Sequence, residues 1–339
     1  MKRFLKASTF LSVVAMFAVL LLKAGVAEAA GAALVEQLNA VAAVSARNIW
    51  AVGYSISGNG EQPLIEHWNG KKWSIVPAPG PNPWPNAINA LNGVAAVSGR
   101  DVWAVGNFTD SNGNLQPLIE RWNGRQWSIV AGAPLPAGFD GGVLSGIEGV
   151  SAHNIWAVGD SFNIATELTQ SLIEHWNGKQ WSIVASPNTG STAFLYGVAE
   201  VSAHNIWAVG NPLGSGLPFT EHWDGKQWSI VAPPAPTGPV ITLFGIAEVS
   251  AHDVWTVGYY IDNRDIDRTL IEHWDGTMWS IIPSPNSGPT ADDVLDGVAA
   301  ISTNNVWAVG SSMNTGSTPG QSLIEHWDGV QWSVVPGTS

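Results

Sequence analysis

The chain reads GIEGVS at 146–151, NIWAVG at 154–159, SLIEHW at 171–176 and QWSIV at 180–184, and this pattern occurs six times. Each segment has the length and apolar composition of a short β-strand, and we name the four strands a, b, c and d in chain order. The Trp of strand b recurs at intervals of 53, 53, 51, 48 and 52 residues, at Trp50, Trp103, Trp156, Trp207, Trp255 and Trp307. A period near fifty with four short apolar runs is typical of a β-propeller blade. The sequence therefore predicts an all-β fold, a six-bladed β-propeller with four antiparallel strands per blade, over residues 38–339.

Turn residues and small residues support this assignment. Asn or Asp followed by Gly separates strands c and d in every copy, as in Asn177-Gly178, and this dipeptide favours the positive φ angles of a tight hairpin. Strand a consists largely of Gly, Ala and Val, as in 93–97, which suits the crowded position where six strands meet around an axis. Strands b and d lack a polar face, so we expect neighbouring blades to cover both faces of each sheet.

Tryptophan supplies most of the predicted core. Eighteen of the 19 Trp residues occupy three repeated positions: on strand b, at the end of strand c and at the start of strand d. We interpret these rings as the packing between blades. Because each copy is complete in chain order, we also expect blade one to close the ring against blade six by face packing alone.

The repeat resembles the kelch repeat. The resemblance rests on Ile155-Trp156-Ala157-Val158-Gly159, a variable loop, Leu172 to Trp176, a turn, and Trp181 opening strand d, and it extends over about 300 residues. One Gly stands where kelch repeats have two. The resemblance implies a propeller. The kelch-type copper enzyme galactose oxidase uses a Cys crosslinked to a Tyr, and this chain has no Cys, which excludes that chemistry.

The c-to-d hairpins are also similar to those of six-bladed fucose-binding lectins, as in Trp223-Asp224-Gly225-Lys226-Gln227-Trp228. Those lectins hold sugar with a Glu three residues before the first Trp. Here Glu221 lies two residues before it, which places it on the other face of the strand, so that binding site does not carry over. The Asp-box of sialidase propellers is less similar, because it separates Asp from Gly by one residue.

The N-terminus has the features of an export signal. Lys2, Arg3 and Lys6 precede an apolar run at 10–22, and Ala27-Glu28-Ala29 precedes Ala30. We expect a signal peptide over 1–29, cleaved after Ala29, and a linker over 30–37. The run of thirteen residues is short for a membrane span, although a retained anchor is the alternative. Secretion or an extracellular surface is the predicted location, and the mature chain is expected to be monomeric and without a membrane span.

Charge restricts the partners. Without residues 1–29 the chain has 10 Lys+Arg and 26 Asp+Glu, a net charge of −16. Such an acidic protein repels phosphate backbones, so no nucleic acid partner is expected, and an extracellular glycan or protein is favoured. No cofactor is predicted.

The connections between strands differ in how much they vary. The a-to-b turns and c-to-d hairpins hardly change among the copies, and we call the end of the propeller that they share the constant end. The b-to-c and d-to-a connections vary and share the opposite, variable end, where recognition usually lies. Aromatic residues beside carboxylates there suggest a carbohydrate or peptide site. The candidate ligand-binding residues are Trp84, Phe139, Asp140, Tyr196, Phe244, Tyr259, Tyr260, Asp292 and Asp293. An alternative is that Tyr196 and Phe244, which follow a repeated Leu, cap the core.

The repeated Glu-His pair of strand c is a tempting catalytic pair. Adjacent strand residues point to opposite faces, so Glu174 and His175 cannot act on one atom. We interpret the repeated Glu as structural, accepting hydrogen bonds from an indole or backbone N–H, with multivalent binding as the alternative.

Metal binding has weak support in the sequence. The loop 262–267 contains oxygen ligands for Ca²⁺ but lacks the Gly and terminal Glu of the helical calcium loop. Glu148, Glu200 and Glu248 on strands a are a second candidate, for a cation in the central channel. The metal content is left open.

The sequence thus predicts a secreted, non-catalytic binding module that recognises carbohydrate or protein through the variable end of the propeller. A structural or adhesive surface scaffold is one alternative, and a glycan-active enzyme is another. No catalytic residue is assigned.

Overall fold

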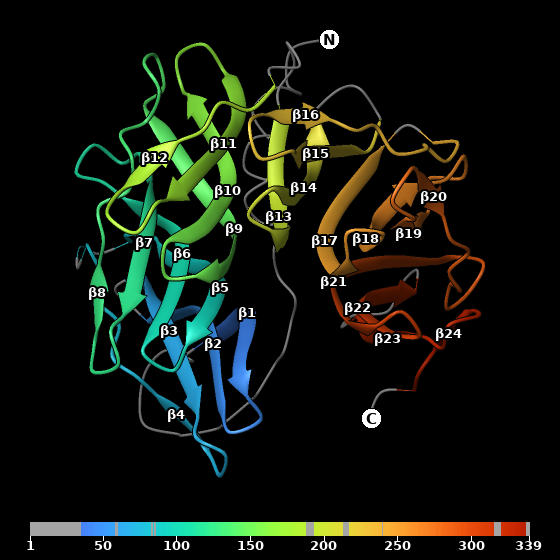
Figure 1. Ribbon diagram of the computed structural model, residues 1–339, viewed down its shortest axis with the longest axis horizontal. Helices are drawn as coiled ribbons and strands as arrows, with labels where there is room; N and C mark the ends of the chain where they lie inside the picture. The colour runs from blue at the N-terminus through green and yellow to red at the C-terminus, as the bar shows by residue number, and fades with distance from the viewer. Residues whose placement is uncertain are drawn as a thin grey trace, which may run out of the picture.

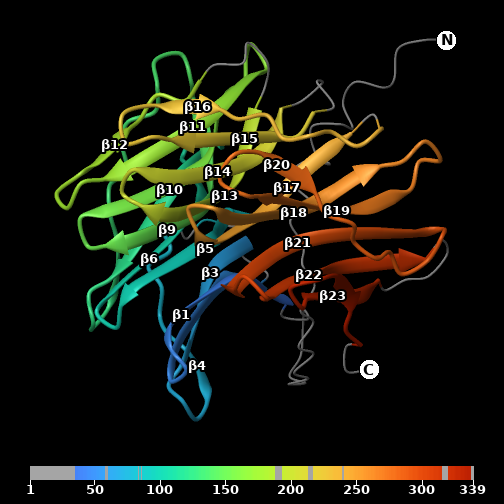
Figure 2. The ribbon, with the colours of Figure 1, turned by 45° about the vertical axis from the view of Figure 1, so that its right-hand side comes forward.

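The computed structural model describes residues 35–57, 60–82, 84, 86–187, 193–212, 217–238, 240–314 and 320–336. Within these residues it contains 24 strands and no helix, arranged as six four-stranded sheets. In every sheet the strands pair antiparallel in chain order, so each blade is built from one continuous copy of the repeat. The predicted all-β, six-bladed β-propeller is confirmed. Figure 1 and Figure 2 show the blades following one another from β1–β4 in blue to β21–β24 in red.

The four strands of a blade occupy successive positions from the axis to the rim. The strands a are β1 (Val35–Ser45), β5 (Asn89–Ser98), β9 (Gly141–Ser151), β13 (Ala193–Ser202), β17 (Ile241–Ser250) and β21 (Ala291–Ser302). The strands b are β2 (Asn48–Ser57), β6 (Asp101–Thr109), β10 (Asn154–Asn163), β14 (Asn205–Pro212), β18 (Asp253–Ile261) and β22 (Asn305–Asn314). The strands c are β3 (Gly60–Trp68), β7 (Leu115–Trp122), β11 (Leu168–Trp176), β15 (Phe219–Trp223), β19 (Asp267–Trp274) and β23 (Gln321–Trp327). The short strands d are β4 (Trp73–Ile75), β8 (Trp127–Ile129), β12 (Trp181–Ile183), β16 (Trp228–Ile230), β20 (Trp279–Ile281) and β24 (Trp332–Val334).

The Asn-Gly and Asp-Gly pairs form the c-to-d hairpins as predicted. In blade one, Trp68 on β3 pairs with Trp73 on β4, and Gly70 has a φ of 89°. The side chain of Asn69 accepts hydrogen bonds from the backbone N–H groups of Lys71 and Lys72 at 3.0 and 3.2 Å. The same bonds and a positive φ recur in the other blades. Each hairpin therefore has a local cause, which explains why the sequence predicts it well.

Indole rings fill the space between neighbouring blades. The ring centroid of Trp50 on β2 lies 5.0 Å from that of Trp122 and 5.4 Å from that of Trp127, both in blade two. The equivalent Trp of blades two to five makes the same two contacts with the following blade, at centroid distances between 4.9 and 5.6 Å. The predicted Trp core is confirmed at these five interfaces.

The strands a approach one another closely around the axis. A Cβ atom on Gly146 would lie 2.8 Å from the carbonyl oxygen of Tyr196 in the next blade, and one on Gly197 would lie 2.8 Å from that of Phe244. A larger residue at either position would push the backbones apart. Steric crowding therefore accounts for the small residues of strand a.

Blade six does not pack against blade one as other neighbouring blades do. In the described parts of these two blades, β1–β4 and β21–β24 lack the extended contacts that join every other pair of neighbours. Trp73 of blade one is 36% exposed, whereas its counterparts in blades two to six are 3–5% exposed. Val309 of blade six is 45% exposed, although its counterparts are fully buried. The expected closing contact is therefore missing, because five similar inter-blade steps do not bring blade six onto blade one. We call this uncovered pair of faces the seam (Figure 1).

Strand β1 begins at Val35, so the first described strand includes residues 35–37 and precedes the expected start of the propeller at Leu38. The predicted signal peptide lies outside the described residues. In the part of the chain that the structure describes, no helix is long and apolar enough to cross a membrane.

Candidate functional site

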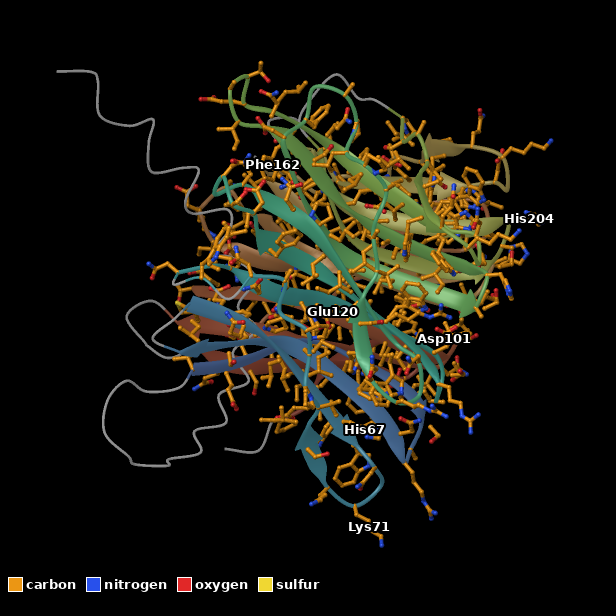
Figure 3. The ribbon with its side chains drawn as sticks, turned by 90° about the vertical axis from the view of Figure 1, so that its left-hand side faces the viewer. His67, Lys71, Asp101, Glu120, Phe162 and His204 are labelled. Carbon is orange, nitrogen blue, oxygen red and sulfur yellow. The ribbon has the colours of Figure 1, made fainter. Side chains whose placement is uncertain are left out.

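The two ends of the propeller differ as the sequence predicts. At the constant end the a-to-b turn packs on the c-to-d hairpin of the same blade, since a Cβ on Gly178 would lie 2.3 Å from the ring of His153. At the variable end the d-to-a and b-to-c connections meet, as the N–H of Asp140 donates to the carbonyl of Phe162 at 3.1 Å. Figure 3 shows Asp101 and His204 at the constant end and Phe162 toward the variable end.

The Glu of strand c is a buried structural group in blades two to six. Glu174 accepts a hydrogen bond from the N–H of Ala133 at 2.9 Å, and Glu221 accepts one from the Ser186 hydroxyl at 2.6 Å. In both cases the donor belongs to the d-to-a connection of the preceding blade, so the carboxyl joins two blades. The predicted role as a hydrogen-bond acceptor is confirmed for Glu174, whose donor is a backbone N–H, whereas Glu221 and Glu325 accept from Ser hydroxyls.

Two of these carboxyls have no such donor. Both carboxyl oxygens of Glu120 and of Glu272 are buried without a hydrogen-bond partner among the described residues. The residues that stand where the other blades have Ser186 or Ser284 are Ala78 and Pro233, which offer no hydroxyl. Burial raises the pKa of both carboxyls to about 8, so they are mainly protonated at neutral pH.

The His of strand c serves the opposite face of the strand. His175 bonds through Nε2 to Oδ1 of Asn154 at 2.7 Å, and its ring lies 4.3 Å from that of Trp156. In blade two the pair is replaced jointly, because Arg121 donates to Asp101 at 2.7 Å. The Glu-His pair is thus two separate structural contacts, and it forms no shared site.

A β-bulge recurs in strand a of every blade, in the half of the strand toward the variable end. The pairing with strand b shifts register there, as between Leu195 and Gly197, so Tyr196 lies at the bulge. The equivalent residues reach the next blade, since the Asn92 side chain donates to the carbonyl of Leu144 at 3.0 Å. The six residues at this position are Asn39, Asn92, Ser145, Tyr196, Phe244 and Asp296.

Predicted site residues from two blades meet at this position. The ring of Tyr196 lies 5.3 Å from that of Phe244, and Phe244 lies 5.9 Å from Tyr259. Phe194 extends the series, because it stacks on Tyr196 at a centroid distance of 6.4 Å. We call Phe194, Tyr196, Phe244 and Tyr259 the aromatic series. Phe194, Tyr196 and Phe244 are half-buried, and Tyr259 is buried.

Carboxyl groups accompany the aromatic series. Burial raises the pKa of Asp160 to about 7. Burial and, to a smaller degree, the charges of Asp160 and Tyr259 raise the pKa of the Tyr196 hydroxyl. Burial also raises the pKa of Asp296 to about 6. Asp160 is not among the site residues predicted from the sequence. The signal was present, because it stands at the one position of strand b that varies among Tyr, Asn, Asp and Ser, directly after the repeated Gly.

The acidic residues of blade six brace the loops of blade five. Both carboxylate oxygens of the fully buried Asp293 accept hydrogen bonds from Ser287, at 2.8 and 2.6 Å. Asp292 accepts one from the N–H of Asp267 at 3.1 Å. Burial and the charge of Asp292 raise the pKa of Asp267 to about 6. Tyr260 pairs with Arg268 on the neighbouring strand.

The remaining candidates lie apart from the aromatic series. Phe139 and Asp140 belong to the connection into blade three, where the carboxylate of Asp140 accepts a hydrogen bond from the N–H of Ile164 at 3.1 Å. Trp84, in the connection between blades one and two, is 50% exposed. The variable end therefore contains several dispersed groups and one cluster, the aromatic series.

The two candidate cation sites differ in their neighbours. Asp262 bonds to Arg264 at 2.9 Å and to Arg268 at 3.1 Å, so guanidinium groups neutralise the carboxylate of the proposed calcium loop. Burial raises the pKa of both Glu148 and Glu200 to about 7, with further contributions from neighbouring carboxylates. Among the described residues there is no group of three acidic or His side chains arranged to hold a metal ion.

Comparisons with known proteins agree with the fold. Neither a protein-family model nor a curated protein matches the chain. YjhT is similar over 88% of this chain and 96% of its own, with 13% identity and a TM-score of 0.53. The Hadza microbial sialidase Hz136 is similar over 86% of this chain and 64% of its own, with 12% identity and a TM-score of 0.53. The SapL1 lectin, solved in complex with alpha methyl fucoside, is similar over 85% and 91%, with 14% identity and a TM-score of 0.50. At these identities the similarity shows the fold and does not establish a kelch-like family.

Proposed function

We propose that this protein is a secreted, kelch-like, non-catalytic binding module that binds a neutral glycan at the variable end of blades three to six. The aromatic series, flanked by Asp160 and Asp296, is the observation that carries this proposal. Aromatic faces stack on the apolar side of a sugar ring, while carboxyl groups exchange hydrogen bonds with its hydroxyls. A lectin among the structures of similar fold is consistent with such a ligand.

The charge of the site supports a neutral ligand. The carboxyl of Asp160, with its pKa of about 7, can both donate and accept a hydrogen bond near neutral pH. The raised pKa of Tyr196 keeps its hydroxyl a donor. A neutral sugar makes no net ion pair, so its affinity should be nearly independent of salt.

A binding screen tests the proposal. The purified protein is applied to a panel of glycans and cell-wall polysaccharides, and positive ligands are measured by titration calorimetry. Tyr196→Ala and Phe244→Ala should each weaken binding at least about tenfold, because each removes a stacking surface. Tyr196→Phe keeps the ring and should lose much less, and Lys226→Ala at the constant end should lose nothing. Unchanged affinity in both alanine variants, with loss in Lys226→Ala, would reject the assignment.

A second candidate function rests on Asp267 and Asp292. Burial and the charge of Asp292 raise the pKa of Asp267 to about 6, and a carboxyl with a raised pKa beside a second carboxyl is the arrangement that glycosidic cleavage uses. A glycan-active enzyme would release soluble sugar from the bound polysaccharide, and Asp267→Asn would abolish that release. Binding without release supports the non-catalytic module.

A further inference from the structure

The basic side chains of the chain are gathered at the constant end. Ten Lys and Arg residues follow residue 29, and only Arg264 and Arg268 lie at the variable end. The other eight are on a-to-b turns, on c-to-d hairpins or at the end of strand c: Arg47, Lys71, Lys72, Arg100, Arg121, Arg125, Lys179 and Lys226. The net charge of −16 therefore conceals a local excess of positive charge.

The fold brings these side chains together in pairs. A Cβ on the hairpin residue Gly124 would lie 2.8 Å from the side chain of Arg100, which places Arg100 against the hairpin that carries Arg125. Both guanidinium groups are exposed, and together with Asn123 and Gly124 they line a hollow in the surface. Arg47 lies against Gly70 in the same way, beside the exposed Lys71 and Lys72. Figure 3 shows Lys71 at the tip of the projecting β3–β4 hairpin.

Carboxylates do not cancel this charge on blades one to three. The first hairpin residue is Asn69, Asn123 or Asn177 there, and the one carboxylate in these turns and hairpins, Asp101, is paired with Arg121 at 2.7 Å. We call the constant end of blades one to three the basic arc.

The opposite half of the same end is acidic. The first hairpin residue of blades four to six is Asp, and the N–H groups and the Thr277 hydroxyl lower the pKa of Asp275 to about 2, so it is ionised. At the positions of Lys71 and Arg125, blades five and six carry Thr277 and Val330. Charge on this end thus changes sign across the ring. Salt screens charges beyond roughly 8 to 10 Å, so a partner at the basic arc is affected mainly by the arc itself.

We propose that the basic arc binds a linear polyanion that carries phosphate groups. Guanidinium groups match phosphate oxygens with paired N–H donors, and Arg100 and Arg125 offer two of them at one hollow. Cations on three successive blades fit an extended chain of anions better than a single ion.

Two variants with equal charge change test the basic arc. Lys71→Gln with Arg125→Gln removes two positive charges from it, and Thr277→Glu with Val330→Glu adds two negative charges to the same positions of blades five and six. All four side chains lie on hairpins outside the core, so both proteins should keep the melting temperature of the unmodified chain. Binding of the full-length chain to inorganic polyphosphate is measured by fluorescence anisotropy at several salt concentrations.

The expected results separate local from overall charge. Lys71→Gln with Arg125→Gln should lower the affinity about tenfold or more and reduce the slope of log affinity against log salt by about 1.5. The blade five and six variant should stay within about twofold of the unmodified chain. Equal weakening by the two variants, or no binding of polyphosphate, would overturn the proposal. The proposal would also be overturned if Lys71→Gln with Arg125→Gln lowered binding to anionic phospholipid vesicles but not to polyphosphate. The basic arc lies at the end opposite the aromatic series, so a negative result for polyphosphate leaves the proposed glycan binding unaffected.

Discussion

Two tryptophans at the same position of the repeat should differ in their contribution to stability. Trp207 of blade four is 1% exposed, and its ring lies 4.9 Å from Trp274 and 5.2 Å from Trp279 of the next blade. In the part of the chain that the structure describes, the half-buried ring of Trp307 in blade six makes no ring contact with a following blade. It keeps the contacts within its own blade, since it lies 4.3 Å from the ring of His326 and donates to Asn305 at 2.8 Å. The comparison therefore isolates the contact between blades.

The expected magnitudes follow from the buried surface. An indole buries ~200 Å², which at ~25 cal/mol/Å² corresponds to about 5 kcal/mol. Trp207→Ala should thus lower the free energy of unfolding by about 3 to 5 kcal/mol. Trp307→Ala loses only the contacts of one face, and about 2 kcal/mol is expected. At about 2 °C per kcal/mol for a chain of this size, the melting temperatures should fall by about 8 and 4 °C.

Urea unfolding followed by tryptophan fluorescence, together with calorimetry, measures both variants. Equal destabilisation would refute the reasoning, because it would mean that the seam closes in solution and covers Trp307. A cysteine pair gives an independent answer, since the chain has no Cys. Ile75→Cys with Val309→Cys places one thiol on each exposed face of the seam. A disulfide within one chain would indicate closure, whereas disulfide-linked multimers would indicate stacking of chains, as the adhesive scaffold requires.

Three further predictions concern single groups. Glu120→Gln should raise the free energy of unfolding by about 2 kcal/mol at pH 9. Burial raises the pKa of this carboxyl from its ordinary value of 4.5 to about 8, so wild-type stability falls as pH rises from about 4.5 through 8, and the amide removes that loss. Chemical unfolding between pH 4 and pH 9 checks this, with Glu36→Gln at an exposed position as the control, and an unchanged pH profile in Glu120→Gln would contradict it. Arg121→Ala should lower the free energy of unfolding by about 3 kcal/mol, because it leaves the buried Asp101 carboxylate without its ion pair. Asp101→Asn with Arg121→His recreates the Asn–His pair of blades one, three, four and six and should restore most of the stability in calorimetry. Trp84→Ala should shift the melting temperature by less than about 1 °C, because the side chain is 50% exposed, and a shift as large as that of Trp207→Ala would show that it belongs to the framework.

Several parts of the site could be predicted from the sequence, and others could not. Tyr196, Phe244 and Tyr259 were selected as aromatic residues next to variable loops, and the structure brings these three together. Asp293 was selected on the same grounds, yet Ser287 binds both its oxygens. Whether a loop carboxylate faces a ligand or braces the next loop depends on a residue of another connection, which no local pattern reveals.

The sequence by itself determined the number of blades, the order of strands and the hairpins. These features depend on interactions within a few residues: the positive φ of Gly70, the side-chain bonds of Asn69, and the alternation of side chains along a strand. Only the tertiary structure decided which side chains lie together at the bulges of strands a, the separation of charge at the constant end, and the open seam. All three depend on how blades about fifty residues apart are placed, and the angle between blades comes from packing of large side chains such as Trp207 and Trp274, summed over five interfaces.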